Sequence, residues 1–155
     1  MNEKALILLN SIQRDLEAIE RLYQELGEPV LSSQSEYRDL IVVAYHLHHL
    51  YNAFENIFLN VAATFENSIE DTERWHTQLL ERMALEVLPL RPKVIDDTAF
   101  DALDELRRFR RLFRHAYRTQ IDAERLQLVL NKAIRLRGLF KPQIDNFLDF
   151  VRTLG

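Results

Sequence analysis

Apolar residues recur along this chain at intervals of three and four, the period of a helix that buries one face. In the first segment, from about Asn2 to Leu26, one stripe contains Leu9, Ile12, Leu16, Ile19, Tyr23 and Leu26. Gly27 and Pro29 follow at once and end the predicted helix.

The second predicted helix, from Glu36 to about Phe65, is apolar almost all round between Ile41 and Phe65. A helix without a polar face is usually buried, so we expect it to be the central helix, with Ser35 as its cap. Residues 67–71 are expected to form a turn. A shorter helix over 72–85 and an irregular connection over 88–97, with two prolines, follow.

Thr98 is the expected cap of a fourth helix that runs to about Arg118, and Asp122 is the expected cap of a fifth that runs to about Arg137. Gly138 and Pro142 predict a kink or a break before a last helix that ends near residue 154. No segment alternates with the period of a strand. The pattern predicts one domain over 1–155, an all-α up-and-down bundle of about five to six helices.

The composition supports a helical domain without structural cross-links. Of 155 residues, 47% are hydrophobic, and only 3 are Gly and 4 are Pro. There is no cysteine, which excludes disulfides and thiolate metal sites and is compatible with a reducing compartment. No apolar run approaches about 18 residues, and the acidic N-terminal segment does not resemble a signal peptide. We expect a soluble, cytoplasmic protein without a membrane partner.

Charge is distributed unevenly along the chain. Residues 1–105 hold 8 Lys and Arg against 20 Asp and Glu, whereas residues 106–155 hold 12 against 4. The overall charge of −4 therefore does not exclude a polyanionic ligand, because binding follows the local charge. The acidic first two-thirds argue against a protein that coats DNA and favour a confined site for an anionic substrate.

The positive charge is concentrated in Leu106–Arg118, where six of thirteen residues are arginine. Phe109, Leu112, Phe113 and Ala116 make the expected core stripe, and Arg107, Arg111, Arg114 and Arg118 fall opposite it. Like charges four residues apart repel and destabilise a helix by ~0.2–0.5 kcal/mol per pair. An anionic ligand would explain why this helix carries so many.

Within this segment, Arg110-x4-His115-x-Tyr117 resembles the motif of HepT-type toxins, which are HEPN-domain ribonucleases. The flanking sequence resembles one HepT-like subfamily over roughly residues 1 to 150. Its landmarks are an aromatic and His-rich second helix over 45–58, Trp75-His76 before Leu79-Leu80, Arg91-Pro92 in a loop, and Ile121-Asp122 at the start of the next helix.

The resemblance implies a metal-independent endoribonuclease without a cofactor, acting on RNA at the cleft of a homodimer. Arg110 and His115 would be its catalytic residues, and Arg108, Arg111 and Arg114 would bind substrate. A histidine exchanges protons near neutral pH, and arginine holds phosphate oxygens. The resemblance also implies a minimal nucleotidyltransferase (MNT) antitoxin, which in this family can AMPylate the matching tyrosine, and it makes Tyr117 the candidate regulatory residue.

The helical positions of these residues leave open which arginine holds the phosphate. On a straight helix, positions 110 and 115 point about 140° apart, whereas 108 and 115 differ by only about 20°. Either Arg110 reaches round the helix, the helix is distorted, or Arg108 or Arg114 shares the role. Arg111 departs from the family, which more often has Asn, Asp or His after the motif arginine. Arginine accepts no hydrogen bond.

Other residues have plainer interpretations. His46 and His49 share a helix face, but no Glu-x-x-His pair accompanies them, so packing beside the site is favoured over metal binding. Glu55 or Tyr51 could orient site residues, and His76 is expected to be structural. Two other functions stay open. One is a non-catalytic helical module that docks nucleic acid or an acidic protein through its arginines. The other is a domain that helps a nucleotidyltransferase bind its substrate.

Overall fold

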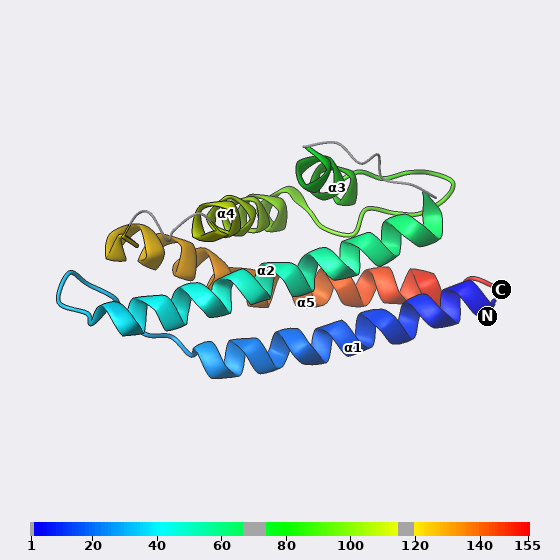
Figure 1. Cartoon of the computed structure of the whole chain (residues 1–155). Coiled ribbons are helices and arrows are strands. Elements are labelled where there is room, and N and C mark those ends of the chain that lie inside the picture. Colours follow the sequence, from blue (N-terminus) through cyan, green and yellow to red (C-terminus); the bar gives the residue numbers. More distant parts are fainter. Residues whose placement is uncertain (1, 67–73, 115–119) are drawn as a thin grey trace.

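The computed structural model describes residues 2–66, 74–114 and 120–155 (Figure 1). In these ranges it has five helices and no strand: α1 (Glu3–Leu26), α2 (Tyr37–Phe65), α3 (Trp75–Met83), α4 (Asp97–Arg114) and α5 (Ala123–Arg152). The all-α bundle predicted from the sequence is confirmed. No helix in the described ranges has the length and apolarity needed to cross a bilayer.

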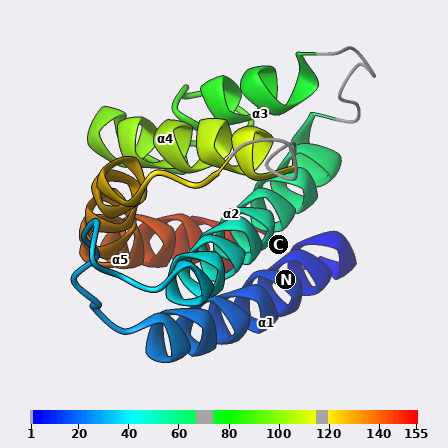
Figure 2. The same ribbon diagram turned by 60° about the vertical axis from the view of Figure 1, so that its left-hand side comes forward.

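The three long helices form the body of the bundle. α1 lies antiparallel to α2, and α5 lies against both (Figures 1 and 2). α4 packs on α2 and α5, and the short α3 packs on α2 and α4. The chain ends meet at one end of the molecule, where the Asn2 side chain is 3.5 Å from the backbone oxygen of Gly155.

α2 is the central helix, as its apolar sequence predicted. It packs against each of the other four helices. Its fully buried side chains include Leu47, Leu50, Tyr51, Phe54, Ile57 and Phe58. The Phe54 ring meets Phe140 of α5 edge to face, with centroids 4.8 Å apart. The only charged residue of α2 that is buried in this core is Glu55.

The predicted helix starts have mixed outcomes. Asp122 caps α5 as expected and accepts a hydrogen bond from the Glu124 backbone at 3.3 Å. Ser35 does not cap α2, because its hydroxyl accepts a hydrogen bond from the Ser32 backbone at 3.0 Å, and α2 begins after Glu36 without a side-chain cap. Local side-chain to backbone bonds of this kind compete with capping.

The expected Thr98 cap is also wrong. Asp96 accepts the hydrogen bond from the Ala99 backbone at 2.8 Å, so α4 starts at Asp97 and Thr98 lies in its first turn. α3 ends at Met83, two residues before its predicted end. Its predicted start and the expected turn over 67–71 lie outside the described residues.

The predicted break at Gly138 and Pro142 does not occur, because α5 continues from Ala123 to Arg152 with Pro142 inside it. Proline within a helix removes one backbone hydrogen bond and costs about 3 kcal/mol. Leu136, Phe140 and Ile144, on both sides of the proline, are all buried in the core. Keeping both halves of the helix on the core offsets that cost.

A buried arginine closes the connection between α3 and α4. Arg91 has no solvent exposure. Its guanidinium pairs with Glu66 at the end of α2 and donates to the backbone oxygens of Arg82, Leu85 and Pro92 at 3.0–3.1 Å. The loop and the end of α2 are thus joined through one side chain.

Candidate functional site

Arg110 occupies the inner face of the last turns of α4. It is only 7% exposed and continues the buried row of Leu103, Leu106 and Phe109. Leu112, expected in the core stripe, is 46% exposed, so that assignment is wrong. The buried face of α4 is therefore rotated from the expected stripe, toward Leu106 and Arg110 and away from Leu112.

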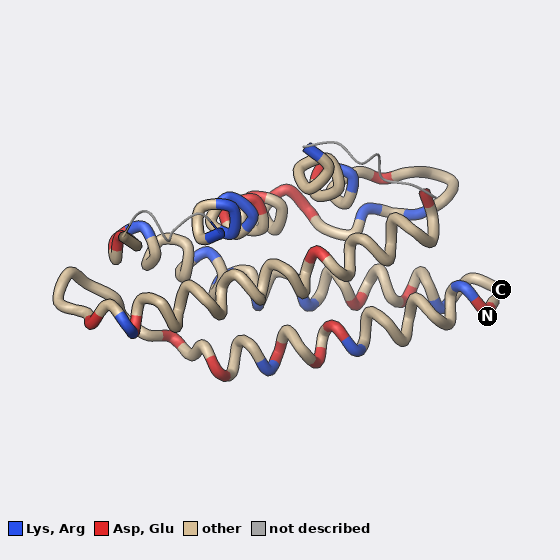
Figure 3. Tube along the Cα trace, in the orientation of Figure 1, with Lys and Arg blue, Asp and Glu red and all other residues tan. Residues whose placement is uncertain are grey.

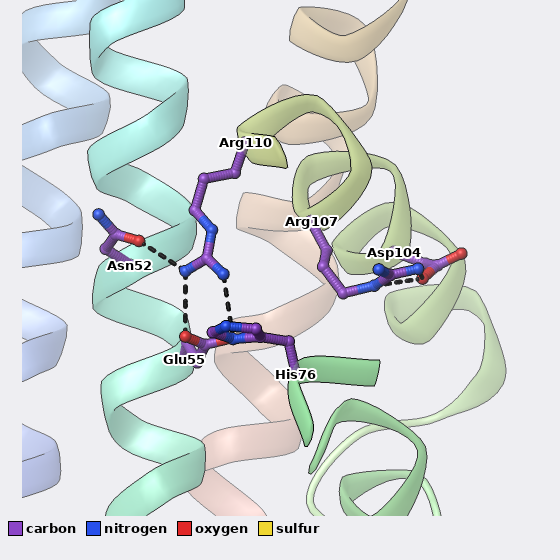
Figure 4. A network of polar contacts seen from close by, with 6 residues as sticks. All are labelled: Asn52, Glu55, His76, Asp104, Arg107 and Arg110. Carbon is purple, nitrogen blue, oxygen red and sulfur yellow. Dashed lines mark hydrogen bonds and ion pairs between the residues drawn. The ribbon is translucent and has the colours of Figure 1, made fainter. Parts of the chain in front are cut away.

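Acceptors on α2 explain this orientation. Arg110 Nη1 donates to Asn52 Oδ1 at 2.8 Å and to Glu55 Oε1 at 3.0 Å (Figure 4). The guanidinium also lies over the Tyr51 ring, 5.0 Å from its centroid. Residues 51, 52 and 55 lie on one side of α2, so a single helix face supplies a carboxylate, an amide oxygen and a ring.

His76 of α3 completes the cluster. Its Nδ1 lies 2.8 Å from Glu55 Oε2 and 3.0 Å from Arg110 Nη2 (Figure 4). Glu55 therefore faces two basic side chains, one with each carboxylate oxygen. α2, α3 and α4 each contribute to this cluster, and we refer to Asn52, Glu55, His76 and Arg110 as the buried cluster.

The cluster extends to a second histidine. Asn52 Nδ2 donates to His48 Nε2 at 3.3 Å. Burial lowers the pKa of His48, and the positive charges of His49, Arg110 and Arg114 lower it further. A neutral His48 is the form that can accept this hydrogen bond, so Asn52 joins His48 to Arg110.

A strongly cationic groove of about 920 Å³ lies between α3 and α4. Its lining includes six arginines, Arg74, Arg107, Arg108, Arg110, Arg111 and Arg114, against two carboxylates, Glu81 and Asp104. His76 lines it too. Figure 3 shows the basic residues gathered along the end of α4. Low-dielectric walls with charge of one sign attract anions such as phosphates.

Asp104 neutralises part of this charge. It forms ion pairs with Arg107 at 2.7 Å and with Arg108 at 2.9 Å. Arg111 and Arg114 are exposed, and neither has an ion-pair partner among the described residues. Arg74, which also lines the groove, is exposed and likewise has no ion-pair partner in these ranges, so these three side chains carry the groove's freest positive charge.

The structure thus brings together the four predicted site arginines but gives them different environments. Arg108, Arg111 and Arg114 line the groove and are exposed, whereas Arg110 lines the groove but is buried. The predicted catalytic His115 and the predicted AMPylation site Tyr117 lie outside the described residues. Asn52, Arg74 and Arg107 were not predicted as site residues. For Asn52 the available signal was its place three residues before Glu55, the only acid between Asp39 and Glu66.

His46 and His48 of α2 have different hydrogen-bond partners and are not arranged to bind one metal ion. His46 donates from Nδ1 to the Val42 backbone oxygen at 2.8 Å and pairs with Glu25, whereas His48 bonds to Asn52. Across the described ranges, no three His, Cys, Asp or Glu side chains are grouped as metal ligands.

A family model described as HepT-like protein matches residues 42–151, well over half of the chain. This chain belongs to the HepT-like family. The family is of the HEPN toxin type, so the resemblance inferred from the Arg-x4-His-x-Tyr pattern is confirmed at this level. The matched range contains the buried cluster and the groove. No curated protein and no solved structure matches the chain.

Proposed function

We propose that this HepT-like protein is the toxin of a HEPN/MNT toxin–antitoxin pair and acts as a metal-independent endoribonuclease. The observation that carries the proposal is the cationic groove of α3 and α4, on which Arg110 is held by Glu55 and Asn52. RNA presents a phosphate at every nucleotide. Exposed Arg111 and Arg114 are suited to bind such a backbone from solvent.

Cleavage without a metal requires two proton transfers. The 2′-oxygen of the RNA loses a proton to a base and bonds to phosphorus, and the bond from phosphorus to the 5′-oxygen breaks as that oxygen takes a proton from an acid. Arginines stabilise the negative charge of the phosphorane. We assign His115 to proton exchange and Arg110 to charge stabilisation, with Arg108, Arg111 and Arg114 holding flanking phosphates.

We propose a homodimer in which two copies of the motif share one cleft. One motif supplies one histidine, and a two-fold pair supplies two. Exposed Tyr37, Ile41 and Tyr45 form a stripe along the first half of α2 and support such an interface, since large apolar side chains on one face mark contact surfaces.

The proposed antitoxin is an MNT-type nucleotidyltransferase that transfers AMP to Tyr117. Tyr117 follows the groove-lining Arg114 by three residues in the sequence, so AMP there would add bulk and negative charge to this arginine-rich segment and would compete with RNA. Mass spectrometry of Tyr117 after coexpression with a candidate MNT-type nucleotidyltransferase tests this part of the proposal. Unmodified Tyr117 in neutralised protein would contradict it.

The test of the nuclease is cleavage of a fluorescent RNA in excess EDTA by the wild type, His115→Ala and Lys132→Gln. Lys132 lies on α5 outside the groove and controls for the loss of one basic side chain. We expect the wild type and Lys132→Gln to cut and His115→Ala to bind RNA without cutting it. Full activity of His115→Ala would refute the assigned role, and no cleavage of a broad RNA panel by the wild type would refute the nuclease.

A non-catalytic binding module is the second candidate, favoured by the burial of Arg110 and the exposure of Arg111 and Arg114. Such a module would bind RNA or an acidic protein through the exposed arginines. Its affinity for RNA would fall stepwise as Arg111 and Arg114 are replaced by Gln. The slope of log affinity against log salt concentration would become shallower by about 0.7–0.9 for each phosphate that is no longer bound. RNA would remain intact in every case.

A further inference from the structure

His76 has one ring nitrogen held in the buried cluster and lies at the edge of the groove. Its side chain is 27% exposed. The ring stacks on Trp75, with centroids 3.6 Å apart and planes tilted by 32°. Trp75 and Glu55 therefore fix both the plane and the rotation of the imidazole, which leaves the other nitrogen, Nε2, with a defined direction.

The contacts of Nδ1 determine where the ring carries its proton. Nδ1 lies within hydrogen-bond distance of both Glu55 Oε2 and Arg110 Nη2, but one ring nitrogen cannot donate and accept at once. If it accepted from Arg110, its lone pair would face the Glu55 carboxylate at 2.8 Å, which is repulsive. If it donates to Glu55, it makes a charge-assisted hydrogen bond, and the 3.0 Å contact with Arg110 Nη2 becomes a contact between two donors. The Glu55 carboxylate, which bonds to both side chains, offsets that contact. Nδ1 is therefore the donor.

Two free groups follow from this assignment. The neutral ring carries its lone pair on Nε2, which makes no hydrogen bond to any residue in the described ranges. Arg110 keeps its Nη1 bonds to Asn52 and Glu55, but its Nη2 then has no acceptor in the same ranges. Both side chains line the groove, so a proton acceptor and a guanidinium donor stand next to one another.

We propose that His76 is a catalytic base of the ribonuclease, with Glu55 as its orienting carboxylate and Arg110 Nη2 as the adjacent phosphate donor. This inference rests on the proposed function. His76 Nε2 takes the proton of the 2′-hydroxyl as the 2′-oxygen bonds to phosphorus. The bond to the 5′-oxygen breaks, and that oxygen takes a proton from a second group, the general acid of the reaction. Glu55 stabilises the imidazolium that forms, as a carboxylate does behind other catalytic histidines.

A purely structural role accounts for only half of the His76 environment. The stacking on Trp75 and the bond to Glu55 use the ring face and Nδ1. Neither explains a histidine whose second nitrogen is unpaired in the described ranges beside six arginines.

The test is cleavage and binding of RNA by His76→Asn. The asparagine amide takes roughly the place of Nδ1, so it can still donate to Glu55, but no atom replaces Nε2. We expect an RNA dissociation constant within about twofold of the wild type and cleavage slower by about 10²–10⁴-fold, the usual effect of losing a base. His46→Asn is the matched control, because His46 bonds to its own helix and Glu25 and lies outside the groove.

A second variant separates catalysis from folding. His76→Ala should lose cleavage and regain part of it when imidazole is added, which a structural defect would not do. Wild-type cleavage by His76→Asn, with His115→Ala inactive, would refute the base and leave the nuclease intact. Loss of RNA binding and cleavage together, without imidazole rescue, would show a structural role and also refute it. A wild type that cuts no RNA removes the nuclease and the base together.

Discussion

Replacing Glu55 by glutamine should destabilise the protein strongly although the side chain keeps its shape. Glu55 and Arg110 are only 7% and 8% exposed, so neither charge is well solvated. Glu55 accepts from Arg110 with one oxygen and from His76 with the other. Glutamine has a single oxygen, so it can accept from only one of them and turns an N–H toward the other.

The expected loss is about 3–5 kcal/mol, the usual cost of removing one partner of a buried ion pair. The Asn52 bond and the Tyr51 ring still contact Arg110, and the groove gives it some access to water, which favours the lower end. Arg110→Met should be costly for the same reason. The double variant Glu55→Gln/Arg110→Met should cost about 1–3 kcal/mol less than the sum of the two single changes.

Urea unfolding followed by circular dichroism at 222 nm measures these free energies. Asp145→Asn is the control, because Asp145 pairs with Lys141 on the surface of α5 at 3.7 Å and should cost less than about 1 kcal/mol. Additivity of the two single changes to within about 0.5 kcal/mol would show that Glu55 and Arg110 are not coupled. The structural account of the buried cluster would then be wrong.

Two further predictions concern stability. Arg91→Met leaves Glu66 and three backbone oxygens without their buried donor, so it should lower the free energy of unfolding by about 3–5 kcal/mol. A melting temperature lowered by under about 2 °C would contradict this. Burial raises the pKa of Tyr23 and of Tyr51, so the folded state keeps protons that the unfolded state loses above pH ~10. The free energy of unfolding should therefore be constant below that pH and should fall above it by about 1.4 kcal/mol per pH unit for each tyrosine. Urea midpoints at pH 9 and 11 should show this fall, and Tyr23→Phe should reduce it, whereas an equal fall in both proteins would exclude Tyr23 as a cause.

Several features of the fold follow from local sequence. The helical period and the scarcity of glycine and proline predict an all-α bundle, and an apolar segment without a polar face predicts that α2 is central. Asp122 and Gly27 mark helix ends because a side-chain oxygen or a positive φ, here 62° at Gly27, acts over two or three residues. The break predicted at Pro142 was wrong because the packing that keeps α5 continuous comes from other helices, which the local sequence does not show.

For the site, the sequence by itself determined that Leu106–Arg118 is rich in arginine and carries an Arg-x4-His-x-Tyr motif. It did not determine which arginine turns inward, because positions 107, 108, 110, 111 and 114 carry the same side chain. That choice depends on Asn52 and Glu55, which lie more than 50 residues away in sequence. The role of His76 depends on the same carboxylate. A charged side chain is buried only where a partner of opposite charge or a hydrogen-bond acceptor is buried beside it. Only the packing of α2, α3 and α4 brings those partners together.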